Sequence, residues 1–100
     1  PGLLHYEVVN AAHRLVRAGR LRHETGERVV AAALALPITV VTGAEILQRA
    51  FALAQTLALP SAYDAHYLAV AKAHECELWT ADARLATAAR ASFPLLRLLE

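Results

Sequence analysis

Asp64 and Asp82 are the two aspartates of this 100-residue chain, and each stands where a regular element is expected to begin or end. Asp64 opens an apolar helical segment in SAYDAHYLAVA, and Asp82 follows a short apolar strand in LWTAD. Side chains at element ends can reach a shared ligand without being buried in the core. Converging carboxylates raise one another's pKa unless a divalent cation neutralises them. Both aspartates also suit a structural role as helix caps.

The elements that carry these residues are indicated by hydrophobic spacing. Five helices are expected at residues 4–18, 23–36, 45–59, 62–74 and 83–90, with strands at 38–41, 78–81 and 95–98. Gly19, Pro37 and Pro60 are expected to end helices, and Ser61 is a natural N-cap. Strands separated by helices predict an α/β fold with a parallel sheet covered by helices on both faces. Sites in such sheets form at the carboxyl ends of the strands.

Composition limits the classes of protein that the chain can belong to. The length of 100 residues predicts one folded domain over residues 1–100, and the hydrophobic share of 57% predicts that most elements are buried rather than disordered. The single cysteine, Cys76, excludes an internal disulfide framework and fits a reducing cytoplasm. The longest uncharged run, residues 29–44, contains Pro37 and is shorter than the roughly 20 residues of a membrane span. No membrane association is expected.

Half of the basic residues are concentrated in one short segment. They are Arg14, Arg17, Arg20, Arg22 and Arg28. Such a cluster can neutralise several phosphates of a nucleic acid. It can equally be a solvated helix face with its loop.

Other chemistries find little support in the sequence. The five histidines have no HExxH spacing, which disfavours a zinc site. Neither Ser61 nor Ser92 has the context of a serine nucleophile, and four scattered glycines form no phosphate-binding loop. Trp79, inside a predicted strand, is expected to pack in the protein interior.

Three segments, in order, resemble the PIN domain, the metal-dependent ribonuclease fold of VapC-type toxins. PGLLHYEVVNAAHRL resembles the segment that supplies the family's glutamate, here Glu7. SAYDAHYLAVA resembles the helix with its second conserved aspartate, here Asp64, and WTADARL resembles the strand end that carries Asp82. The resemblance implies a three-layer parallel sheet with helices on both faces.

The family's opening segment has no counterpart in this sequence. That segment is a hydrophobic strand ending in an aspartate, followed by a first helix. We therefore expect a PIN-like domain over residues 1–100 that lacks this strand and helix. A sheet without this strand would leave apolar strands unpaired. We expect a neighbouring chain to supply the strand or the remaining elements to repack.

The resemblance implies a role for each candidate site residue. Glu7, Asp64 and Asp82 are the expected catalytic residues and the ligands of Mg²⁺ or Mn²⁺. Thr80 is expected to hydrogen-bond near the site, and Asn10 is expected to orient Glu7 or a water.

The implied activity is hydrolysis of RNA phosphodiester bonds by a metal-dependent endoribonuclease in the cytoplasm. Arg14 and Arg84 are the candidates for contacts with the RNA phosphates. The resemblance also implies a toxin that forms a homodimer and is neutralised by a cognate antitoxin.

Two other functions compete with this one. The first is a non-catalytic, truncated PIN fragment that serves as an interaction or dimerisation module. The second is cleavage of DNA or flap structures by a PIN relative. At the level of single residues, Asp64 and Asp82 can be caps, and Glu7, placed in the first turn of its helix, can serve the helix dipole.

Overall fold

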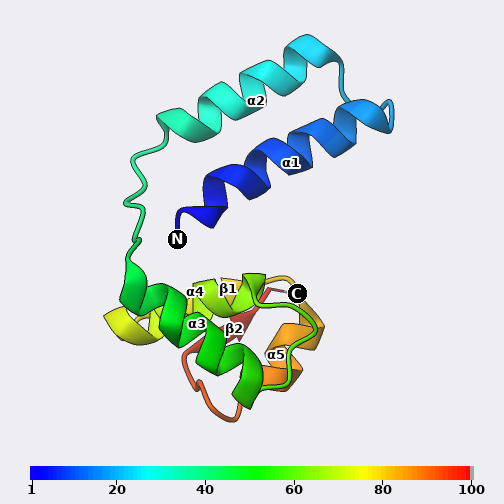
Figure 1. Ribbon diagram of the computed structural model, residues 1–100. Helices are drawn as coiled ribbons and strands as arrows, with labels where there is room; N and C mark the ends of the chain where they lie inside the picture. Colours follow the sequence, from blue (N-terminus) through cyan, green and yellow to red (C-terminus); the bar gives the residue numbers. More distant parts are fainter. Residues whose placement is uncertain (100) are drawn as a thin grey trace. The chain divides into compact units, whose positions relative to one another are not determined.

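The computed structural model describes residues 1–99 of the chain. Two compact units are present, one formed by residues 2–40 and the other by the residues from 41 onward together with Pro1. Figure 1 traces both, and each is described by itself. The described residues contain five helices and one two-stranded sheet.

The first unit is a hairpin of two helices, α1 (Leu3–Arg17) and α2 (His23–Ala35), which lie side by side (Figure 1). Their facing sides carry small residues, because Ala12 of α1 and Gly26 of α2 are both buried. A Cβ atom built on Gly26 would lie 2.9 Å from Val16 Cγ2. The glycine therefore allows the two helices to approach closely.

The chain leaves α1 through a turn centred on Gly19, as the sequence predicts. Gly19 adopts φ of +74°, a left-handed conformation that glycine takes without strain. Its amide donates to Val16 O at 3.0 Å, and the amide of Arg20 donates to Leu15 O at 2.9 Å. This pair of hydrogen bonds satisfies carbonyls that the helix leaves open at its end.

Residues 38–41 form no strand, so the sequence prediction of one there is wrong. They are β-branched and favour extended backbone, but within the described chain they pair with no other strand. The amide of Ile38 instead donates to Leu36 O at 2.8 Å, which is a local turn. Ile38 is 49% exposed, whereas Val41 is half-buried and packs against an alanine-rich cluster of the second unit.

The second unit holds the remaining elements. They are α3 (Ala44–Thr56), α4 (Tyr63–His74), β1 (Leu78–Thr80), α5 (Ala83–Ala89) and β2 (Leu96–Leu98). The two strands run parallel, and α5 is the connection between them (Figure 1). All five elements were expected from the sequence, with ends that differ by at most about three residues.

The core that supports β1 is an apolar cluster shared by α4, α5 and β2. Leu68 of α4 is its largest fully buried side chain, and Leu85, Phe93 and Leu96 pack with it. Leu78 of β1 lies opposite Leu96 in the parallel register and packs against the same cluster. The strand that leads to Asp82 is thus held by α4 on one side and by β2 along its edge.

The contact between α3 and α4 is built mainly from alanine. Buried residues there are Ile46, Ala50, Ala54, Ala65 and Ala69. Such small side chains let two helix backbones approach, and this packing fixes the beginning of α4.

Ser61 does not cap α4, contrary to the sequence prediction. The helix begins at Tyr63, the N-cap position falls on Ala62, and no side chain makes a capping hydrogen bond there. Ser61 stands one residue too early to reach the first-turn amides. His66 contacts this end of the helix instead, since its Nδ1 donates to Ala62 O at 2.7 Å.

The fold class is mixed α/β, as predicted. The described residues form a small two-stranded parallel sheet rather than a sheet of three strands. Within residues 1–99, no helix has the length and apolar character needed to cross a membrane.

Candidate active site

Asp82 stands between β1 and α5, and its carboxylate caps the helix. Its Oδ1 accepts hydrogen bonds from the backbone amides of Arg84 at 2.9 Å and Leu85 at 3.2 Å. These first-turn amides have no partner within the helix. The capping interpretation of Asp82 is therefore confirmed. Because Oδ1 makes both bonds, Oδ2 of this exposed side chain remains open to a cation or a water.

Thr80 fixes the backbone that carries Asp82. Its Oγ1 accepts a hydrogen bond from the amide of Asp82 at 3.0 Å. Its carbonyl oxygen accepts another from the amide of Leu99 at 2.7 Å, on the side of β2. The sheet thus fixes Thr80, and Thr80 fixes the loop that leads into α5.

Asp64 lies in the first turn of α4 and is half-buried. From Asp64 to His74 the helix covers about 15 Å. The chain then turns at Glu75 and runs back through β1, which ends at Thr80. Since α4 packs against β1, this path places Asp64 and Asp82 toward the same end of the second unit.

Glu7, Asn10 and Arg14 follow one another along one face of α1, and all three are exposed. The helix begins at Leu3, so Glu7 lies beyond its first turn and the predicted first-turn position is wrong. The helix dipole acts mainly on the first turn, which removes the dipole explanation for this residue. The three residues belong to the hairpin, and their approach to the aspartates stays a prediction.

Arg84 is the second residue of α5 and is exposed. Its amide takes part in the cap on Asp82. The arginine is therefore anchored beside the carboxylate, where a basic side chain can contact a phosphate.

Trp79 takes part in an arrangement that the sequence analysis missed. The expectation that it packs in the interior is wrong, because it is 59% exposed. Its Nε1 donates to Glu77 Oε2 at 3.0 Å, and Arg97 of β2 lies 3.5 Å from Glu77 Oε1. The spacing of Glu77 and Trp79 was the available signal, since residues two apart on a strand share a face.

The donor atoms of the candidate ligands suit a hard cation. Among residues 1–99, no three histidine, cysteine, aspartate or glutamate side chains lie close enough together to hold a metal ion. The candidate ligands are carboxylate oxygens, which Mg²⁺ and Mn²⁺ prefer. Asp82 keeps one such oxygen outside its cap, at the end of the unit where Asp64 also lies.

Known proteins resemble this chain over most of its length. It is 33% identical over 95 residues to VapC ribonuclease Mb0985 of Mycobacterium bovis, and equally to Ribonuclease VapC9 of Mycobacterium tuberculosis. Each alignment covers 95% of this chain and 72% of the relative. No solved structure matches significantly. Residues 1–91 match the PIN domain family, and the chain therefore belongs to that family.

Proposed function

We propose that the protein is a Mg²⁺- or Mn²⁺-dependent endoribonuclease that hydrolyses RNA phosphodiester bonds, the toxin of a toxin–antitoxin pair. The observation that carries this proposal is the geometry of Asp82. One oxygen caps α5 and orients the carboxylate, while the other is left open at the end of the unit where Asp64 lies. Similarity to two proteins named as VapC ribonucleases supports the same activity.

Asp64 and Asp82 would hold the cation, with Glu7 contributing directly or through a water. When bound, a hard divalent cation supplies positive charge to the phosphodiester and lowers the pKa of a water. Asp82 presents Oδ2 in a direction set by its two amide hydrogen bonds and by Thr80. Asn10, one helical turn after Glu7, would orient that carboxylate or a water. Arg14 and Arg84 would contact the phosphates.

We further propose that the two units belong to one PIN-like domain with three layers. Helices would then cover both faces of the parallel sheet, as in the family. The chain would act in the cytoplasm as a homodimer and would be neutralised by an antitoxin. Exposed apolar side chains support such partners, because Leu47 and Phe51, one turn apart on α3, are 59% and 64% exposed.

A non-catalytic interaction module is the second candidate function. It is favoured by the exposed apolar side chains Leu47 and Phe51 on α3, which suit a protein partner. Such a module would keep the fold and its partners but would need neither the cation nor Asp82 Oδ2.

Cleavage of a labelled RNA in the presence of Mn²⁺ separates these two functions. The matched set is the parent chain, Asp64→Asn, Asp82→Asn and Glu45→Gln, which removes one negative charge from an exposed position on α3. We expect cleavage by the parent and by Glu45→Gln, a loss of at least about 100-fold in each aspartate variant, and complete inhibition by EDTA.

The opposite results are equally informative. A parent chain that self-associates but leaves RNA intact, with or without Mn²⁺, would favour the interaction module. Equal cleavage of RNA and single-stranded DNA would favour the DNA- or flap-cleaving alternative.

A further inference from the structure

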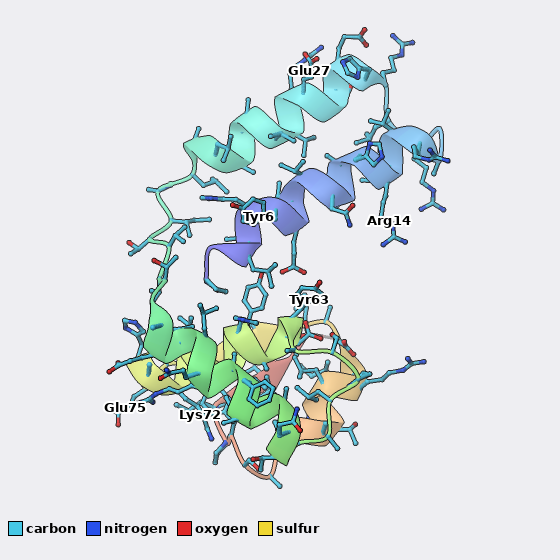
Figure 2. The ribbon with its side chains drawn as sticks, in the orientation of Figure 1. Tyr6, Arg14, Glu27, Tyr63, Lys72 and Glu75 are labelled. Carbon is cyan, nitrogen blue, oxygen red and sulfur yellow. The ribbon has the colours of Figure 1, made fainter. Side chains whose placement is uncertain are left out.

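A row of polar and basic side chains runs along one face of α1. Glu7, Asn10, Arg14 and Arg17 follow at spacings that return to the same side of an α-helix, and all are exposed. Arg20, in the loop after α1, is exposed beyond the end of this row. These five residues are termed the α1 stripe. Figure 2 shows Arg14 projecting from α1 on the side away from α2.

The end of the stripe beyond Glu7 is rich in positive charge. The chain contains no aspartate or glutamate between Glu7 and Glu24. Within residues 1–99, none of Arg14, Arg17 and Arg20 forms an ion pair. Unpaired arginines at one end of a helical hairpin attract an anionic ligand.

A hollow of about 510 Å³ lies at the end of the stripe. Arg14 and Arg20 line it together with Ala11, Leu15 and Ala18. Guanidinium groups can bind phosphate oxygens in a bidentate manner. The apolar side chains of Ala11, Leu15 and Ala18 offer a surface against which a ribose or a base can lie.

We infer that the α1 stripe binds the RNA backbone next to the phosphodiester that is cleaved. This inference rests on the proposed function, in which Glu7 belongs to the metal site. Along the helix axis, Arg14 lies about 10 Å and Arg17 about 15 Å from Glu7. An RNA whose scissile phosphate is at Glu7 would therefore place its neighbouring phosphates over these arginines. Such contacts fix the position of the strand and do not read its sequence.

Two other roles for the arginines must be distinguished from RNA binding. Arg14 and Arg17 lie in the last turn of α1, where basic residues stabilise the helix dipole. Arg20 lies beyond the helix and has no such role. An acidic segment of a partner protein would also bind these arginines. It would not explain why they share one helix face with Glu7, the proposed metal ligand.

The test is the salt dependence of RNA binding by the full chain. Asp82→Asn serves as the background that prevents cleavage while retaining the cap, and the probe is a labelled single-stranded RNA of mixed sequence. Each phosphate contact contributes about 0.7 to the slope of log affinity against log salt. Combining Arg14→Gln, Arg17→Gln and Arg20→Gln should lower the slope by about 2. Raising the salt concentration from about 50 to 200 mM should then weaken RNA binding by a factor that is about 20-fold smaller than in the Asp82→Asn background.

Two control variants keep the result specific. Arg49→Gln, Lys72→Gln and Arg90→Gln, combined, remove the same charge from positions outside the stripe and outside the basic cluster, and should leave the slope nearly unchanged. Replacing Arg14, Arg17 and Arg20 by lysine keeps the charge and should retain most of the slope. Circular dichroism of every variant checks that the helices remain.

The inference is overturned if both glutamine variants change the slope equally, or if the stripe variant leaves it unchanged. It is also overturned if polyglutamate binds the stripe and RNA does not. RNA cleavage by the unsubstituted chain with Mn²⁺ is measured in parallel. Absence of that cleavage would refute the proposed nuclease, whereas cleavage with an unchanged slope would refute the role of the stripe alone.

Discussion

The amide of Asp82 donates a 3.0 Å hydrogen bond to the hydroxyl of Thr80. This bond joins the last residue of β1 to the backbone of the residue whose carboxylate caps α5. The short turn after β1 therefore fixes where the backbone of Asp82, the candidate metal ligand, lies relative to the sheet. Thr80 thus holds the backbone of Asp82, and Asp82 presents the carboxylate that caps α5.

Replacing Thr80 by valine should weaken metal binding without removing a ligand. The hydroxyl acceptor is lost, which should lower Mn²⁺ affinity about tenfold and the free energy of unfolding by about 1 kcal/mol. Isothermal calorimetry and urea unfolding measure the two effects. Thr80→Ser retains the hydroxyl and should remain close to the parent in both. Parent-like affinity and stability in Thr80→Val would show that the hydrogen bond does not matter, and losses confined to Thr80→Ser would assign the role to the methyl group.

The capping and metal-binding functions of Asp82 should separate in a pair of variants. The amide oxygen introduced by Asp82→Asn can still accept the first-turn amides of α5, so this substitution should change the free energy of unfolding by only about 0.3 kcal/mol. Asp82→Ala removes the cap and should cost about 1 kcal/mol. Both variants should lose Mn²⁺ binding. Retention of binding by Asp82→Asn would limit this residue to capping.

Gly26→Ala should destabilise the helical hairpin. The added Cβ would lie 2.9 Å from Val16 Cγ2, and overpacking of this kind costs about 1–3 kcal/mol. Alanine regains up to about 1 kcal/mol of helix propensity, so a net loss of about 1 kcal/mol is expected in urea unfolding. In a Val16→Ala background the same substitution should be neutral or stabilising. An equal loss in both backgrounds would exclude the clash as the cause.

Glu75→Gly should stabilise the end of α4. Glu75 has φ of +50°, and the amide of Cys76 donates to Ala71 O at 3.1 Å in a helix-ending motif. Glycine removes the steric cost of this conformation, with a gain of about 1 kcal/mol. Thermal unfolding should show a higher Tm than for Glu75→Ala, which loses the same charge but keeps the strained φ. A lower or equal Tm for the glycine variant would contradict this explanation.

The helices were predictable from the sequence because their spacing and stops are local features. Gly19 ends the hairpin's first helix with two backbone hydrogen bonds, and Pro37 follows the second. The cap at Asp82 was also foreseen from its place between a strand and a helix. These features depend on the few residues around them.

Features that require distant partners were not predictable. Residues 38–41 have the composition of a strand, but a strand forms only where another one accepts its hydrogen bonds. Trp79 is exposed, and its neighbours are Glu77 and Arg97, the second of which comes from the partner strand β2. Whether Glu7 meets the two aspartates likewise depends on long-range packing, and that part of the site remains a prediction.

Calorimetric titration with Mn²⁺ tests the central claim, that Asp64 and Asp82 share one divalent cation. The samples are the parent chain, Asp64→Asn, Asp82→Asn and the charge-matched control Glu45→Gln. The claim predicts binding by the parent and by Glu45→Gln, with a loss in each aspartate variant and unchanged circular dichroism. Failure of the parent to bind Mn²⁺, or binding that survives in either aspartate variant, would contradict it.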